Sequence, residues 1–192
     1  MQLNIFQAIH ELALSLDEEF KRSPFVFKSS DSTKTFKPAY PTIHEFCVPP
    51  EDINEHGYPI DLPAIAIIVE TINPSNLDMR AHIGIHIAVC NPSTSESEVA
   101  TGNNETGYVF KGGEGYSQEN AYRDLYAACI HLGEQSLNVL AYISPKIRLE
   151  NISMTAPDVN MDDFPFAACV IACDLIYSAS YRAKSPEITQ LL

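Results

Sequence analysis

Apolar side chains recur at helical intervals over the first twenty residues. Their spacing of three or four residues is typical of an amphipathic helix, and the positions are Ile5, Phe6, Ile9, Leu12, Ala13, Leu16 and Phe20. Asn4 can cap the start with its side-chain oxygen. Pro24 ends the pattern, because proline disfavours helical backbone in Ser23 and cannot continue the hydrogen-bond ladder itself. We therefore expect a helix over residues 5–20.

Two strand-like runs follow in the middle of the chain. Pro63–Val69 is apolar at almost every position, as in a central strand that is covered on both faces. Ala81–Cys90 alternates instead, so its side chains are expected on two different faces of a sheet. One row is Ile83, Ile85, Ile87 and Val89, and the other is His82, Gly84, His86, Ala88 and Cys90. Asn73-Pro74-Ser75-Asn76 predicts a turn between the two strands.

A second helix and two further strands are predicted in the last half. The glycine-rich step Gly113–Tyr116 leads into a helix over Ser117–Leu137, with Ser117 as its N-cap. Its expected buried stripe is Ala121, Leu125, Ala128, Cys129 and Leu132. The strands are Lys146–Ser153 and Phe166–Tyr177, with an acidic, proline-containing loop between them. The small residues of the last strand indicate that a helix packs closely on the sheet.

Two stretches have weaker patterns. Within 24–62, Phe25–Lys28 and Thr33–Lys37 indicate a hairpin, and Thr42–Val48 indicates a third strand, while the remainder is a surface loop. A stretch this long without a dominant element indicates an arm, a hairpin insertion or a lid. Asn91–Glu114 is polar and is predicted to be a mobile loop.

These elements predict one α+β domain over residues 1–192. We expect an α/β sandwich, in which a mostly antiparallel or mixed sheet is flanked by the N-terminal helix and the long central helix. A chain of 192 residues with 45% hydrophobic composition is long enough to bury a core of its own.

Charge and cysteine content narrow the class of protein. The net charge of −13 argues against a nucleic-acid-binding surface, although it also suits solubility alone. No apolar run is long enough to cross a bilayer, and the first residues lack the basic start of a signal peptide, so we expect a protein made in a cytoplasm. The five cysteines are an odd number without a CxxC motif, as expected for buried apolar residues rather than disulfides.

The side chains that could carry chemistry do not form a site at the spacing that chemistry needs. On an extended strand His82 and His86 are about 13 Å apart, too far to share one metal ion. The acids at Glu51-Asp52 and Asp162-Asp163 read as solvated loop charges. The glycines before Gly115 lack the Gly-Lys-Ser/Thr ending of a phosphate loop. The sequence therefore predicts no catalytic residue, no cofactor and no metal, and hence no enzyme.

The order of these elements resembles the tail terminator proteins of long-tailed bacteriophages. The resemblance covers about 130 residues and includes the first helix, Pro63–Ile67, Ile83–Ile87, the Gly115-Tyr116 step, and a helix with Tyr122-Arg123-Asp124-Leu125 near its start. Leu149-Glu150 and a final strand introduced by Phe164-Pro165 complete it. The order is characteristic of the family, whereas no single motif is diagnostic. One departure is that about 40 residues, 24–62, separate the first helix from the apolar strand.

The resemblance implies a virion protein of the tail and neck, made in the cytoplasm of a bacterial host. Such proteins form a ring, usually a hexamer, that caps the tail tube and joins it to the head-completion proteins, while DNA only passes through the lumen. The loop 91–116 is the expected assembly interface, with Ser93, Glu96, Glu98, Asn104, Glu114 and Tyr116 as its contact residues. The alternatives are another neck component, such as a head-completion or stopper protein, and a small hydrolase or ligand-binding domain that uses the face carrying His82 and His86.

Overall fold

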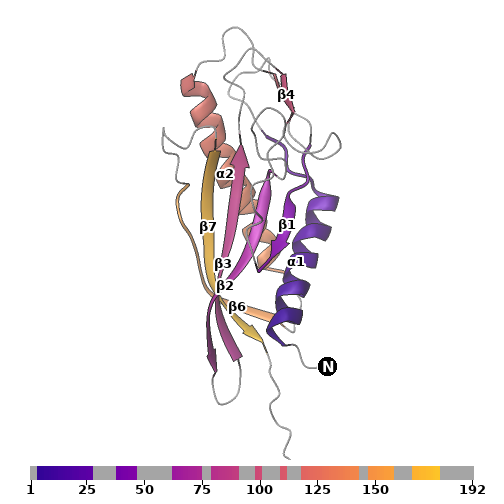
Figure 1. The fold of residues 1–192 in the computed structure, drawn as a ribbon, viewed down its shortest axis with the longest axis vertical. Coiled ribbons are helices and arrows are strands. Elements are labelled where there is room, and N and C mark those ends of the chain that lie inside the picture. The colour runs from indigo at the N-terminus through magenta and orange to yellow at the C-terminus, as the bar shows by residue number, and fades with distance from the viewer. Residues whose placement is uncertain are drawn as a thin grey trace, which may run out of the picture.

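The computed structural model describes residues 4–27, 38–46, 62–74, 79–90, 98–100, 109–111, 118–142, 147–157 and 166–177. These residues form a mixed five-stranded sheet with two long helices, α1 and α2, and a separate two-stranded sheet (Figure 1). The α+β class expected from the sequence is therefore confirmed.

Helix α1 spans Ile5–Arg22 and has a capping box at its start. The Asn4 side chain accepts a hydrogen bond from the backbone N–H of Gln7, and the Gln7 side chain accepts one from the backbone N–H of Asn4. These two bonds satisfy backbone groups that a helix end otherwise leaves free. Ser23 is the C-cap, so the predicted cap and end are both confirmed, with the helix continuing two residues past Phe20.

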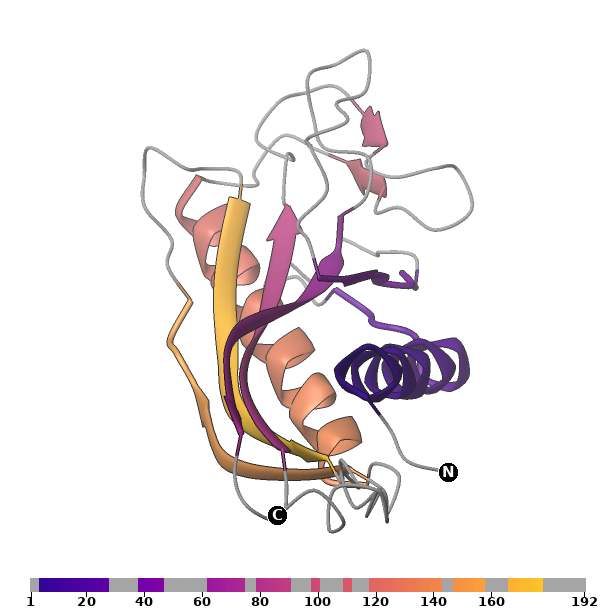
Figure 2. The same cartoon turned by 60° about the horizontal axis from the view of Figure 1, so that its bottom comes forward.

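The five-stranded sheet has the strand order β1-β2-β3-β7-β6. The strands are β1 (Thr42–Glu45), β2 (Ala64–Pro74), β3 (Met79–Cys90), β6 (Ile147–Met154) and β7 (Phe166–Tyr177). Strand β1 runs parallel to β2, and all other neighbours are antiparallel. Figure 2 shows α1 and α2 on the same side of this sheet.

The core lies between the helices and that side of the sheet. The two rows of β3 lie on different faces as predicted, and the row that points inward is completely buried: Ile83, Ile85, Ile87 and Val89. Helix α1 contributes the apolar positions recognised in the sequence, of which Leu12, Leu16 and Phe20 are also buried. The opposite row of β3 faces away from both helices.

Helix α2 spans Gln118–Leu140, three residues further than expected, and packs on β3 and β7. Helix α2 lies close to the sheet at Gly133. A Cβ at this position would lie 2.6 Å from Met154 Sδ in β6 and 3.5 Å from Cys169 Sγ in β7. The close packing inferred from the small residues of β7 is thus confirmed at the Gly133–Cys169 contact.

Two predicted loops contain strands. The predicted loop 91–114 includes two short strands that the sequence analysis did not identify, β4 (Glu98–Ala100) and β5 (Val109–Lys111), which pair in antiparallel register. These three-residue strands are too short to show a periodic pattern. The turn predicted from Asn73 is also displaced, because β2 continues through Asn73 and Pro74 to pair with Arg80 and Met79.

The stretch 24–62 contributes to the main body at several points. Phe25 and Ala39 exchange two backbone hydrogen bonds, of 2.9 and 2.7 Å, and both side chains are completely buried. Phe27 is buried too, and β1 supplies the parallel edge of the main sheet. The predicted second arm of a hairpin, Thr33–Lys37, lies outside the described residues.

Candidate functional site

The predicted assembly interface falls almost entirely outside the residues that the structure describes. Ser93, Glu96, Asn104, Glu114 and Tyr116 are in this group. Glu98 is the first residue of β4 and pairs through its backbone with Lys111 of β5. The interface therefore stays a prediction. The described residues form two other surfaces that could bind a partner.

The first surface is the face of the main sheet that the two helices leave uncovered. Strand register places its residues in rows across the strands. One row contains His44 of β1, Ala66 of β2 and His86 of β3. The next contains small or aliphatic residues, and a third contains His82 beside Asp174 of β7. We call this surface the open face.

A network of charged side chains crosses one end of the open face. His82 Nδ1 lies 3.1 Å from Asp174 Oδ1, and His82 Nε2 lies 3.4 Å from Glu70 Oε2. The guanidinium of Arg80 lies 3.0 Å from Glu150 Oε2 and 3.4 Å from Asp174 Oδ2. The network therefore joins β2, β3, β6 and β7 through charge-assisted contacts.

Two β-bulges supply members of this network. Glu70 lies where the register of β2 with β3 shifts, and Asn151 lies where that of β6 with β7 shifts. Asn151 has a φ of 53°, a left-handed conformation that asparagine tolerates better than most residues. Its side-chain amide donates a 2.7 Å hydrogen bond to Asp174 Oδ2. Bulges of this kind redirect side chains that a regular strand would place elsewhere.

Asp174 is the centre of the network and is held as a carboxylate. Hydrogen bonds from Asn151 and His82, together with the positive charge of Arg80, lower the pKa of the Asp174 carboxyl below its ordinary value. Only 16% of its side chain is exposed, so the attraction is less screened by solvent than that of a fully exposed pair. Asp174 is also the only charged residue in the sequence of β7, the one signal that could have identified it.

His82 and His86 share the open face but have different surroundings. His86 leans over Gly84, where an added Cβ would lie 2.9 Å from both His86 Nε2 and Glu70 Oε1. His82 instead contacts carboxylates from two neighbouring strands. In the described part of the chain, no three His, Cys, Asp or Glu side chains are arranged to hold a metal ion.

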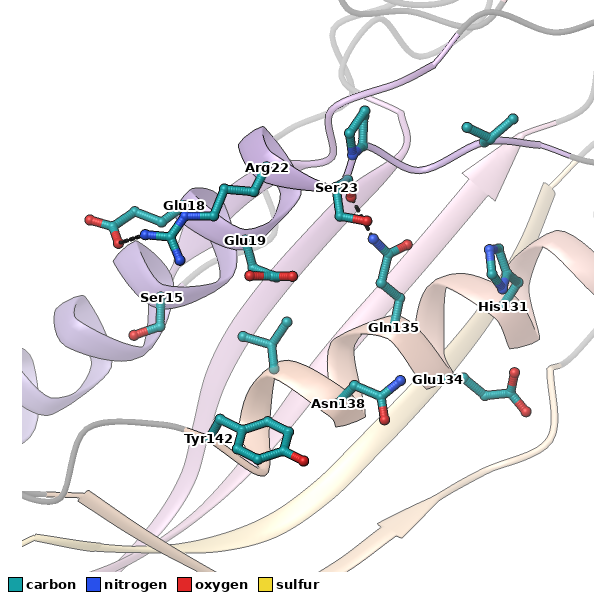
Figure 3. A pocket seen from close by; sticks show the side chains of 13 residues that line it. Ser15, Glu18, Glu19, Arg22, Ser23, His131, Glu134, Gln135, Asn138 and Tyr142 are labelled. Atoms are coloured by element: carbon teal, nitrogen blue, oxygen red, sulfur yellow. Dashed lines mark hydrogen bonds and ion pairs between the residues drawn. The ribbon is translucent and has the colours of Figure 1, made fainter.

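The second surface is a groove of about 880 Å³ between α1 and α2, on the opposite side of the sheet (Figure 3). It lies between the last two turns of α1, the chain around Pro24, and the C-terminal half of α2. Its lining residues are Ser15, Glu18, Glu19, Arg22, Ser23, Pro24, Val26, His131, Glu134, Gln135, Asn138, Val139 and Tyr142. Gln135 of α2 donates a hydrogen bond to the backbone carbonyl of Ser23, which ties the two walls together.

The groove is acidic. Arg22 is its only arginine or lysine and lies 3.7 Å from Glu18 across one helical turn. The carboxylates of Glu19 and Glu134 have no cation beside them among the described residues. Tyr142, with 90% of its surface exposed, adds an aromatic ring at the end of α2. A cationic side chain could therefore find carboxylates, amide oxygens and an aromatic face in one place.

The described cysteines are structural. Cys129, Cys169 and Cys173 are buried free thiols, as the odd cysteine count suggested. Burial raises the pKa of Cys173 to about 12, so its thiol is uncharged near neutral pH. A hydrogen bond with Cys169 and burial raise the pKa of Cys129 as well. Cys129 and Cys173 are therefore not poised to act as nucleophiles. The hydrogen bond with Cys129 lowers the pKa of Cys169, while burial acts in the opposite direction.

The comparisons with known proteins add no assignment to this geometry: no protein-family model and no curated protein matches the chain. Within the described residues, no helix is both long and apolar enough to pass through a membrane.

Proposed function

We propose that this chain is a virion assembly protein of the tail-terminator type, whose copies form a ring on the end of a phage tail tube. The ring ends tube growth and presents its far side to the head-completion proteins. The resemblance in element order motivates this proposal, since helix, apolar strand, alternating strand, long helix and final strand pair follow one another as in that family.

The observation that carries the proposal is the one-sided covering of the main sheet. Both described helices pack on one face of the sheet (Figure 2). The open face presents small residues and side chains that already pair with each other. Small residues allow a neighbouring backbone to approach closely. Charges that are neutralised within the chain lower the cost of burying them under a partner. A surface of this kind suits contact with another folded subunit better than capture of a small molecule.

The acidic composition agrees with a ring around DNA. A net charge of −13 repels the phosphate backbone, so DNA could slide through a lumen without adhering to its wall. A protein that binds DNA through its own surface needs an excess of positive charge on that surface instead.

The hydrolase alternative lacks a supporting site among the described residues. It requires a pocket in which His82 and His86 converge, but the groove lies on the helix side of the sheet and the two histidines lie on the open face. Another neck component fits the same surfaces and differs only in the partner that it binds.

Single-particle electron microscopy of the purified chain, alone and mixed with tail tubes, tests the proposal. Rings of about six subunits that bind tube ends and stop their elongation are the expected result. Tubes that elongate normally at saturating protein would contradict it. Binding to head-completion proteins without any effect on tubes would assign the chain to another position in the neck.

A further inference from the structure

We propose that Cys129 of α2 and Cys169 of β7 form a latent disulfide, that is, two free thiols held in contact that are joined when the protein meets a peroxide. The bond would tie the long helix covalently to the main sheet. It would also connect two elements that stand about 40 residues apart in sequence.

The Cys169 sulfur lies against the turn of α2 that runs from Cys129 to Gly133. Cys169 Sγ is 3.9 Å from the backbone carbonyl oxygen of Cys129. It is also 3.5 Å from the point at which a Cβ of Gly133 would lie. Residues four positions apart lie on the same face of a helix. These two distances therefore place the Cys169 sulfur on the face of α2 that carries both Cys129 and Gly133.

The two thiols also contact each other. A hydrogen bond joins the side chains of Cys129 and Cys169. Cys129 is completely buried, and only 2% of Cys169 is exposed. A disulfide bond is about 2.05 Å long, so side-chain rotation must bring the two sulfurs closer before the bond can form. Gly133 leaves space beside them, and the neighbouring Met154 side chain is flexible enough to adjust.

Cys173 is the natural control for this pair. It belongs to the same strand as Cys169 and is buried too. Four residues along an extended strand separate the two Cα atoms by about 13 Å. A disulfide spans a Cα separation of about 7 Å at most. Cys173 is therefore a buried thiol of the same strand that cannot pair with Cys169 while β7 is formed.

The oxidation consumes one peroxide molecule for each pair. The Cys169 thiolate attacks one oxygen of hydrogen peroxide, the O–O bond breaks, and the leaving hydroxide takes up the thiol proton to give water. The Cys129 sulfur then attacks the sulfenic acid of Cys169, the S–O bond breaks, and the second water leaves with the proton of Cys129. Two thiols and one hydrogen peroxide thus give one disulfide and two waters, and peroxide gains the two electrons that the sulfurs lose.

The two cysteines have different parts in this reaction. The hydrogen bond with Cys129 lowers the pKa of the Cys169 thiol, so Cys169 is the sulfur expected to attack first. Burial favours a small oxidant. Hydrogen peroxide is little larger than water and needs only a local separation of α2 from β7 to reach the sulfurs, whereas a bulky disulfide reagent needs a wider opening.

The compartment determines when the bond forms. Thiols stay reduced in a cytoplasm, whereas disulfides persist on the surfaces of virions and cells. This timing rests on the proposed function, in which the chain leaves the cytoplasm as part of a virion. Subunits would then assemble with free thiols, and each copy would be cross-linked internally after release. The cross-link stabilises every subunit without requiring a new contact between subunits.

Peroxide treatment of the purified full chain tests the pair. The folded, reduced protein is exposed to a small molar excess of hydrogen peroxide at pH 7 and digested without reductant, and tandem mass spectrometry identifies linked peptides. The variants are Cys129→Ala and Cys169→Ala, with Cys173→Ala as the matched control. Circular dichroism checks that each variant folds. The same treatment in urea shows which links form without the native structure.

We expect the folded wild-type chain to lose two hydrogen atoms and to give one linked peptide, which joins residue 129 to residue 169. Cys173→Ala should give the same link, whereas Cys129→Ala and Cys169→Ala should not. The linked protein should melt roughly 10 °C higher than the reduced protein, because the bond restricts the unfolded chain. Dithiothreitol should reverse this shift, which distinguishes it from any effect of methionine oxidation.

Three results would overturn the inference. The first is that both thiols stay free even when treatment is repeated a few degrees below the melting temperature, where the native chain opens often. The second is that Cys129 or Cys169 links mainly to another cysteine in the folded chain. The third is a linked protein that melts no higher than the reduced one. The treatment uses isolated chains, so a 129–169 link in a protein without effect on tail tubes would reject only the proposed function.

Discussion

His82 Nδ1 lies 3.1 Å from Asp174 Oδ1 across the pairing of β3, the central strand of the main sheet, with its neighbour β7. The same carboxyl group accepts hydrogen bonds from Arg80 and Asn151, so one side chain of β7 joins partners from two strands, β3 and β6. This relationship makes Asp174 a stability determinant of the open face.

Replacing Asp174 with asparagine should destabilise the protein by about 1 kcal/mol at pH 7, because charge-assisted hydrogen bonds are lost while the surface screens part of the effect. The pKa of Asp174 is lowered in the folded state, so its stabilising contribution is present above the ordinary carboxyl pKa and is lost as pH falls through the lowered value. Urea unfolding of both proteins from pH 7 to pH 2 should show the difference vanish in acid. A difference that stays constant across this range would contradict the assignment.

Asn4→Ala should cost about 1 kcal/mol by removing the cap of α1. The substitution leaves the N–H of Gln7 without its side-chain acceptor, whereas the backbone N–H of residue 4 can still donate to the Gln7 side chain. Thermal unfolding followed by circular dichroism measures the loss. Asn4→Asp is the matched control, since aspartate caps a helix as well as asparagine does, and it should stay within about 0.5 kcal/mol of wild type.

Gly133→Val should destabilise the protein by about 2–4 kcal/mol, because branched bulk would overlap Met154 Sδ and press on Cys169 Sγ. Gly133→Ala should be milder, since helix propensity favours alanine by about 1 kcal/mol and the methionine side chain can move. Chemical denaturation measures both variants. Adding Met154→Ala to Gly133→Val should recover part of the loss, and no recovery would argue against this contact as the cause.

The buried thiols should resist modification in the folded protein. At pH 8, Cys129, Cys169 and Cys173 should react with a disulfide reagent only at the rate of unfolding, as resolved by peptide mass spectrometry. The pKa of Cys173 is raised to about 12 on folding, so its contribution to stability is complete below the ordinary thiol pKa and is lost as pH rises toward 12. As pH rises from 9 to 12, Cys173→Ala should therefore lose less stability than the wild-type protein does. Rapid labelling of the native thiols would contradict their burial.

The strong periodic patterns predicted most of the fold. The helical spacing from Ile5 to Phe20, the alternation around Ile85 and the apolar run ending at Tyr177 each identified an element and, in β3, the two rows of side chains that lie on different faces. These patterns predict the elements because an element with one buried face has apolar residues that recur at the spacing of that face.

The two surfaces could not be predicted in the same way. The network forms because strand order puts β7 between β3 and β6, which brings Asp174 to His82 over a long separation in sequence. Bulges at Glu70 and Asn151 then break the period on which sequence inference depends. The groove requires the relative positions of two helices, which neither helix encodes alone. The single acid within β7, Asp174, stood out in the sequence, but nothing in the sequence identified His82 as its partner.

The position of β7 in the sheet also governs when the protein can fold during synthesis. This strand is the last in sequence among the described residues, yet it lies between β3 and β6 and pairs with both. Until the ribosome has made residues 166–177, the edge of β3 that faces away from β2 has no partner strand, and β6 has no place in the sheet. The sheet can therefore close only after β7 has been made, and the unpaired edge of β3 is open to chaperones and to aggregation until then.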